Sequence, residues 1–238
     1  MLKGDDNMNE MRQNEYGAFV GEVPTIINAS ESHMALVLVL DTSYSMDGPP
    51  IDQLNEGLNR FKAEICADRQ TREVLDVAII QFSDTYSIVQ DFVPVEYMDY
   101  INLTANGGTK YTDPIREALR MVDDRSRFYR RSGTEPYKPW IILVTDGEPL
   151  DNIDQVAREV EDMQQEGKVR FIALGVGDYQ SAPLKQLTDV VFRMEGTDFT
   201  SFFNWVGKSM RSVSTTAPGE KPPLPPLEGN VFRDVSDI

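Results

Sequence analysis

Asp41, Ser43 and Ser45 place one carboxylate and two hydroxyls in a five-residue segment, Asp-Thr-Ser-Tyr-Ser. Two hydroxyls at alternate positions after a carboxylate can converge in a tight loop. Hydroxyl and carboxylate oxygens are hard ligands, which suit Mg²⁺ or Mn²⁺ rather than a soft metal. The same residues could instead cap a helix that follows, so the segment alone leaves both interpretations open.

A second acid, Asp146, shares the sequence setting of Asp41. Residues 34–41 (MALVLVLD) and 140–146 (WIILVTD) are apolar runs that each end in an aspartate. Such runs are typical of strands buried on both faces of a parallel sheet. Parallel α/β sheets bind ligands at the carboxyl ends of their strands. We therefore expect both carboxylates at one edge of one sheet.

The elements between these runs predict the fold class. Helical spacing of apolar residues follows Pro50 and Pro114 and recurs in residues 151–166 and 199–213, while further strands are expected at 74–84, 85–92, 169–177 and 190–194. The first two of these strands could pair as a hairpin. Alternating strands and helices indicate an α/β fold with a doubly wound, Rossmann-like, mostly parallel sheet flanked by helices, with one antiparallel edge strand.

Composition shifts divide the chain into three parts. We expect a polar N-terminal extension over residues 1–32, a folded domain over 33–216 and a proline-rich, flexible tail over 217–238, where the stretch PPLPP disfavours regular helix.

The charge and composition exclude several classes of function. Acidic residues outnumber basic ones by 39 to 23, giving a net charge of −16, which disfavours direct binding to nucleic acid or to an anionic membrane. The single Cys66 excludes an intramolecular disulfide, and the single His33, which we expect at the surface, excludes a multi-histidine metal site. No run is long enough for a transmembrane helix and the N-terminus has no signal-peptide core, so we expect a cytoplasmic protein.

Three spaced motifs resemble the metal-ion-dependent adhesion site of von Willebrand factor A domains. That family has an Asp-x-Ser-x-Ser loop after its first strand, a Thr in a second loop and an Asp at the end of a later strand. Here these are Asp41, Ser43 and Ser45, then Thr109 in the segment NGGT, then Asp146 in the segment VTDG. The resemblance covers about residues 34–213 and implies that all five residues hold Mg²⁺, with Mn²⁺ as the other candidate.

The resemblance also implies a mechanism of binding. In A domains, the equivalents of Ser43 and Ser45 bind the metal directly, that of Thr109 binds directly or through water, and the two aspartates often act through water. Because the direct ligands are mostly neutral, the cation keeps much of its charge and favours an Asp or Glu from a protein partner. The chain would then be a non-enzymatic binding protein.

Two segments look like a narrower group within that family. Residues 41–58 and 184–210 are similar to the TerY-like bacterial proteins of tellurite-resistance and stress operons, although Tyr44 replaces the glycine that is usual in that group. This similarity implies a scaffold in a bacterial stress or defence system, with protein kinases or phosphatases among its partners.

Two alternatives remain open. A strand ending in Asp41 is similar to the start of aspartyl-phosphate enzymes, which would make the chain a metal-dependent phosphatase or hydrolase; those enzymes generally carry a second Asp where this chain has Ser43. The other alternative is an A domain that binds partners without metal, through its helices or tail. Near the site, we expect Asp84 to be a turn carboxylate and Lys110 a solvated side chain.

Overall fold

The computed structural model describes residues 12–13, 19–20, 31–217 and 219–234. The predicted N-terminal extension therefore lies largely outside the described residues. Within it, β1 (Arg12–Gln13) and β2 (Phe19–Val20) form a short antiparallel pair.

The main sheet has seven strands in the order β5-β4-β3-β6-β7-β8-β9. Strands β3, β4, β6, β7 and β8 run parallel, while β5 at one edge is antiparallel to β4, which confirms the predicted fold class. At the other edge, β9 pairs antiparallel with β8 and was not predicted. The strands are β3 (Met34–Asp41), β4 (Leu75–Phe82), β5 (Tyr86–Pro94), β6 (Trp140–Thr145), β7 (Arg170–Val176), β8 (Val191–Met194) and β9 (Val231–Arg233).

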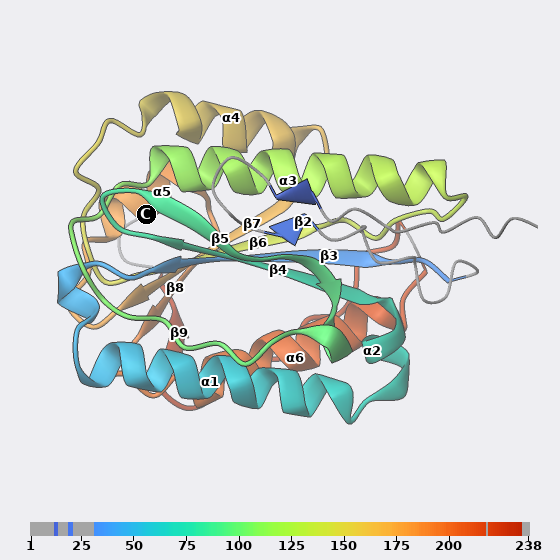
Figure 1. The fold of residues 1–238 in the computed structure, drawn as a ribbon, viewed down its shortest axis with the longest axis horizontal. Coiled ribbons are helices and arrows are strands. Elements are labelled where there is room, and N and C mark those ends of the chain that lie inside the picture. The colour runs from blue at the N-terminus through green and yellow to red at the C-terminus, as the bar shows by residue number, and fades with distance from the viewer. Residues whose placement is uncertain (1–11, 14–18, 21–30, 218, 235–238) are drawn as a thin grey trace, which may run out of the picture.

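Helices cover both faces of this sheet, so the domain has three layers (Figure 1). One face carries α1 (Pro49–Cys66), α2 (Arg69–Val74) and α6 (Thr200–Ser214). The opposite face carries α3 (Thr112–Arg131), α4 (Asp154–Gln165) and α5 (Ser181–Leu187). Two short 3₁₀ helices, η1 (Tyr44–Met46) and η2 (Val95–Tyr97), lie in the loops.

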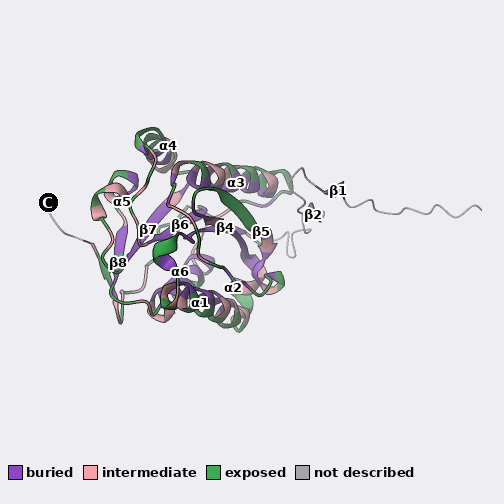
Figure 2. Cartoon of the chain, turned by 60° about the vertical axis from the view of Figure 1, so that its left-hand side comes forward, coloured by how far each residue is buried: buried purple, intermediate pink, exposed green. Residues whose placement is uncertain are grey.

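Two apolar cores fill the spaces between the layers, and β3 contributes to both. Leu36, Leu38 and Leu40 belong to the core under α1 and α6, whereas Val37 and Val39 belong to the core under α3 and α4. Figure 2 shows the same arrangement, with buried residues along the sheet and on the inner sides of the helices. This two-sided burial is the physical reason for the continuous apolar runs in the sequence.

His33 lies inside the protein, so the expectation of a surface residue was wrong. It is 1% exposed, with its ring centroid 5.4 Å from that of Tyr129 and its Nδ1 3.9 Å from Asp76 Oδ2. Arg125 of α3 donates to the same carboxylate oxygen over 2.7 Å. These partners are distant from His33 in the sequence. They surround the imidazole, which would otherwise contact water at its position just before β3.

The C-terminal segment, residues 219–234, is packed against the domain, so the expectation of a flexible tail is corrected for these residues. Trp205 Nε1 donates to Pro225 O over 2.9 Å, and Leu224 and Leu227 pack against the core on the side of α6. The segment then ends in β9. A proline-rich stretch has free carbonyls and no internal hydrogen bonds to lose, so it can lie extended across a helix.

Candidate metal centre

The two strand-end aspartates come from neighbouring strands at the centre of the sheet. Asp41 is the last residue of β3, and Asp146 directly follows β6. These strands are parallel, with Leu40 opposite Val144. Both carboxylates therefore lie where the carboxyl ends of the parallel strands meet, as the sequence predicted. We call this end of the sheet its carboxyl edge.

The first loop brings its two hydroxyls together. Asp41 Oδ1 accepts a hydrogen bond from Ser43 N at 2.8 Å, and the turn of η1 places Ser43 Oγ 3.0 Å from Ser45 Oγ. Helix α1 begins later, after Gly48, and no side chain caps its first turn. The hydroxyls of this loop are thus not helix caps, which removes the simpler interpretation of the segment.

Asp146 completes a chain of oxygens with the first loop. Ser45 Oγ donates to Asp146 Oδ1 over 2.6 Å, across a sequence separation of 101 residues. Ser43, Ser45 and Asp146 therefore present three oxygens to one another at an edge that solvent can reach, since Ser45 is exposed.

The second loop lies against both of the others. Asn106 N donates to Thr42 O over 2.7 Å and Tyr44 N donates to Gly107 O over 3.0 Å. A methyl group placed on Gly147 would be 3.1 Å from the hydroxyl oxygen of Thr109, so this hydroxyl lies beside the residue that follows Asp146. All five predicted ligand residues are thus found at the end of β3 or in the three adjoining loops.

Two hydroxyl side chains that the sequence analysis missed hold this edge in place. Thr145 Oγ1 donates to Asp41 Oδ2 over 2.5 Å, and Tyr111 donates its hydroxyl hydrogen to Gly147 O over 2.6 Å. The sequence could have indicated Thr145, because its hydroxyl directly precedes the strand-end Asp146. No local sequence pattern predicts the role of the buried Tyr111.

Burial disfavours the ionised forms of the two carboxylates when no cation is bound. Desolvation raises the pKa of Asp41 from its ordinary value of 3.8 to about 6, against the lowering effect of its hydrogen bonds, and the charge of Asp146 adds a smaller contribution. Desolvation also raises the pKa of Asp146. A cation at this edge would stabilise both charged forms.

The oxygen set fits a hard divalent ion. Among the described residues, no group of three or more His, Cys, Asp or Glu side chains is placed to hold a metal. A site at this edge therefore depends on the hydroxyls of Ser43, Ser45 and Thr109 together with two carboxylates, a donor set that suits Mg²⁺ or Mn²⁺ and offers nothing to a soft metal.

The side chain of Asp84 lies against the second loop. A methyl group on Gly107 would be 2.7 Å from Asp84 Oδ2, and one on Gly108 would be 2.8 Å from Asp84 Oδ1. The carboxylate therefore covers the glycine pair of the second loop. Asp84, Tyr44 and Lys110 are all exposed there.

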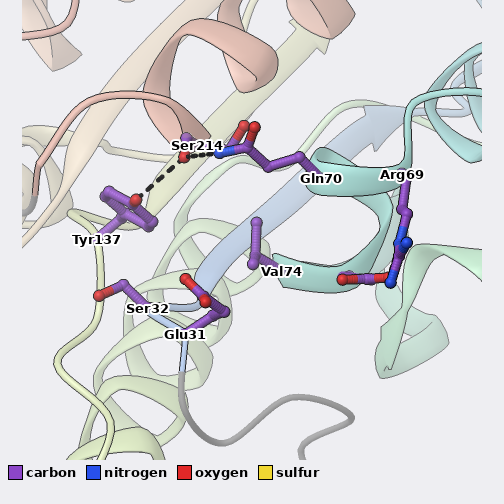
Figure 3. Close-up of a pocket in the computed structure, with 8 residues that line it drawn as sticks. Glu31, Ser32, Arg69, Gln70, Val74, Tyr137 and Ser214 are labelled. Atoms are coloured by element: carbon purple, nitrogen blue, oxygen red, sulfur yellow. Dashed lines mark hydrogen bonds and ion pairs between the residues drawn. The ribbon is translucent and has the colours of Figure 1, made fainter.

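A hollow elsewhere on the surface is unrelated to this edge (Figure 3). It has a volume of about 290 Å³ and is lined in part by Ser32. Ser32 lies just before β3, at the amino ends of the parallel strands, whereas Asp41 lies at their carboxyl ends. Gln70 Nε2 and the Tyr137 hydroxyl both donate to Ser214 O, over 2.9 and 3.3 Å. These bonds hold α2 and α6 together and supply no cluster of metal ligands.

The sheet order and the helices on both faces define a three-layer α/β domain. Residues 35–204, more than half of the chain, match the von Willebrand factor type A domain family. The chain belongs to this family, whose fold serves protein interaction and adhesion. A comparison with curated proteins gave no match. In the described residues, no helix is both long and apolar enough to cross a bilayer.

Solved structures show the same fold at low sequence identity. The pilus adhesin SpaC from Lactobacillus rhamnosus GG, in its open conformation, is 16% identical with a TM-score of 0.62, over 75% of this chain and 30% of the adhesin. Proximal thread matrix protein 1 from the mussel byssus is 15% identical with a TM-score of 0.53, over 76% of this chain and 48% of that protein. The chain thus spans less than half of either relative.

Proposed function

We propose that this domain binds Mg²⁺ through Asp41, Ser43, Ser45, Thr109 and Asp146, and that the bound ion recruits a protein partner through an Asp or Glu of that partner. Mn²⁺ would fit the same hard donor set. The observation that carries the proposal is the run of oxygens from Ser43 Oγ through Ser45 Oγ to Asp146 Oδ1, at separations of 3.0 and 2.6 Å.

The residues divide into two roles. The hydroxyls of Ser43, Ser45 and Thr109 are neutral ligands, so an ion held by them keeps most of its positive charge for an incoming carboxylate. Asp41 is buried and shapes the loop through its hydrogen bond to Ser43 N. Asp146 lies partly exposed and would supply negative charge at the rim.

This role is non-enzymatic. A phosphatase of the aspartyl-phosphate type would need an acid two positions after Asp41, whereas Ser43 occupies that position with its hydroxyl 3.0 Å from Ser45 Oγ. Turnover of a phosphate ester that disappears in Asp41→Asn would favour the enzyme instead.

The cellular setting belongs to the same proposal. The similarity of residues 41–58 and 184–210 to TerY-like proteins supports a cytoplasmic scaffold in a bacterial stress, tellurite-resistance or defence system. Kinases or phosphatases of such a system are candidate partners.

The proposal is tested by metal binding and partner capture in parallel. A ligand present at about 100 times its dissociation constant stabilises the folded state by about 2.7 kcal/mol, so saturating Mg²⁺ should raise the melting temperature of the wild type. Ser43→Ala should lose most of this increase, whereas Ser87→Ala, which removes an exposed hydroxyl on β5, should keep it. Equal stabilisation of both variants would refute the ligand assignment.

Partner capture tests the second part of the proposal, the recruitment of a protein through the bound ion. A tagged wild-type chain and the Ser43→Ala variant are compared in native bacterial lysate, with Mg²⁺ and with EDTA. Proteins retained only by the wild type in Mg²⁺ would support recruitment through the metal. Equal retention in all four conditions would place the binding surface on the helices or the C-terminal segment.

A further inference from the structure

Two large apolar side chains stand exposed beside the candidate metal centre. Tyr44 in the first loop is 72% exposed, and Leu150 in the loop after β6 is 69% exposed. Isolated exposed apolar residues are common on protein surfaces, but here both belong to the loops that carry the ligand residues.

The backbones of Tyr44 and Leu150 are both hydrogen-bonded to the second loop, and the Leu150 side chain lies over it. Tyr44 N donates to Gly107 O over 3.0 Å, and Leu150 N donates to Thr109 O over 2.8 Å. A methyl group on Gly108 would be 2.6 Å from Leu150 Cδ1 and 2.8 Å from Asp84 Oδ1, so Leu150 and Asp84 cover the same glycine. We name Tyr44, Gly107, Gly108, Asp84 and Leu150 the rim strip.

The charge of the rim strip and its surroundings is mainly negative. Asp84 is exposed within the strip, and Asp47 and Glu148 are exposed in the flanking loops. The whole chain carries a net charge of −16. A partner that brings a carboxylate to the ion would be repelled by this surface unless neighbouring basic groups offset the repulsion.

We propose that the rim strip selects a partner segment in which the metal-binding Asp or Glu is accompanied by an apolar side chain and a Lys or Arg. This inference rests on the proposed function. The apolar side chain packs between Tyr44 and Leu150, and the basic side chain pairs with Asp84.

The test selects short random peptides, displayed on phage, against the wild-type chain in Mg²⁺ and elutes them with EDTA. The expected peptides combine an acid, a large apolar residue and a Lys or Arg. Tyr44→Ser and Leu150→Ala should each bind them about tenfold more weakly, the effect typical of an exposed anchor residue in an interface. Tyr97→Ser, which alters an exposed tyrosine in η2 at the opposite edge of the sheet, should bind them like the wild type.

A charge reversal sharpens the test. Selection against Asp84→Lys should replace the basic residue of the peptides with a further acid, while Mg²⁺ alone still raises the melting temperature of this variant. Unchanged peptide preference in Asp84→Lys, or unchanged affinity in both Tyr44→Ser and Leu150→Ala, would overturn the inference.

The metal readout separates this inference from the function on which it rests. If Mg²⁺ stabilises the wild type but selection recovers no peptides that depend on Mg²⁺, the rim strip does not select such segments and only this inference fails. If Mg²⁺ does not stabilise the wild type, the proposed function is refuted and this inference with it.

Discussion

In the metal-free protein, Asp41→Asn should raise the free energy of unfolding at neutral pH. Asp41 is completely buried, and burial raises its pKa from 3.8 to about 6. A carboxyl group whose pKa is higher in the folded state destabilises that state once it ionises. A difference of about two pKa units corresponds to about 3 kcal/mol. The asparagine removes the charge but can still accept from Ser43 N and donate to Thr145 Oγ1.

The sign of the effect fixes the pH window. Well below the ordinary pKa of 3.8 the carboxyl is protonated in both the folded and the unfolded state, so wild type and variant should differ little. As the pH rises from about 4 to about 6, the unfolded state ionises first and the wild type loses stability relative to Asp41→Asn. Above about pH 6 the difference should be complete and constant.

Urea unfolding in EDTA at a series of pH values measures this difference directly. Asp84→Asn serves as the matched control, because it makes the same substitution at an exposed carboxylate near the same loops. Saturating Mg²⁺ should narrow this difference at neutral pH, since the ion offsets the cost of the buried charge in the wild type and binds the neutral asparagine variant more weakly. The reasoning would be refuted if Asp41→Asn were less stable than the wild type in EDTA at neutral pH, or if their difference were independent of pH.

Three further predictions concern the packing of the domain that carries the site. Arg125→Met leaves the carboxylate of Asp76 buried without its guanidinium partner and should cost about 3–5 kcal/mol in urea unfolding, with stabilisation by Mg²⁺ retained; a cost under about 1 kcal/mol would argue against the buried pair. Gly57→Ala places a methyl group 2.8 Å from the ring of Phe203, so thermal unfolding should reveal a loss of about 1–3 kcal/mol, and an unchanged melting temperature would contradict the close α1–α6 packing. Trp205→Phe removes one hydrogen bond to the C-terminal segment, worth about 1 kcal/mol, and should speed proteolysis within that segment; cleavage at the wild-type rate would show that the bond does not hold it.

The strand-end position of the candidate site could be predicted because its signals are local. Asp41 and Asp146 each end an apolar run, and the helical spacing between such runs implies parallel strands with their carboxyl ends together. The Asp-x-Ser-x-Ser spacing likewise acts within one loop, where η1 brings Ser43 and Ser45 to 3.0 Å.

The parts that could not be predicted depend on contacts between distant residues. Tyr111 reaches Gly147 O across 36 residues, and His33 is buried by partners on β4 and α3. The C-terminal segment gains its order from Trp205 and from pairing with β8, neither of which is visible in a proline-rich composition. Local propensity therefore indicates an extended tail, while tertiary packing decides where it lies.

The geometry of the three loops is set mainly by backbone hydrogen bonds. Asn106 N to Thr42 O and Tyr44 N to Gly107 O join the first and second loops, and Leu150 N to Thr109 O joins the second and third. None of these bonds uses a ligand side chain. The hydroxyls and carboxylates are consequently held on a frame that persists when one of them is changed, whereas Gly107, with φ of 71° and Asp84 Oδ2 only 2.7 Å from the position of a Cβ, belongs to the frame itself. Substitutions at the ligand residues therefore report on the ion, and substitutions at the glycine report on the loops that hold it.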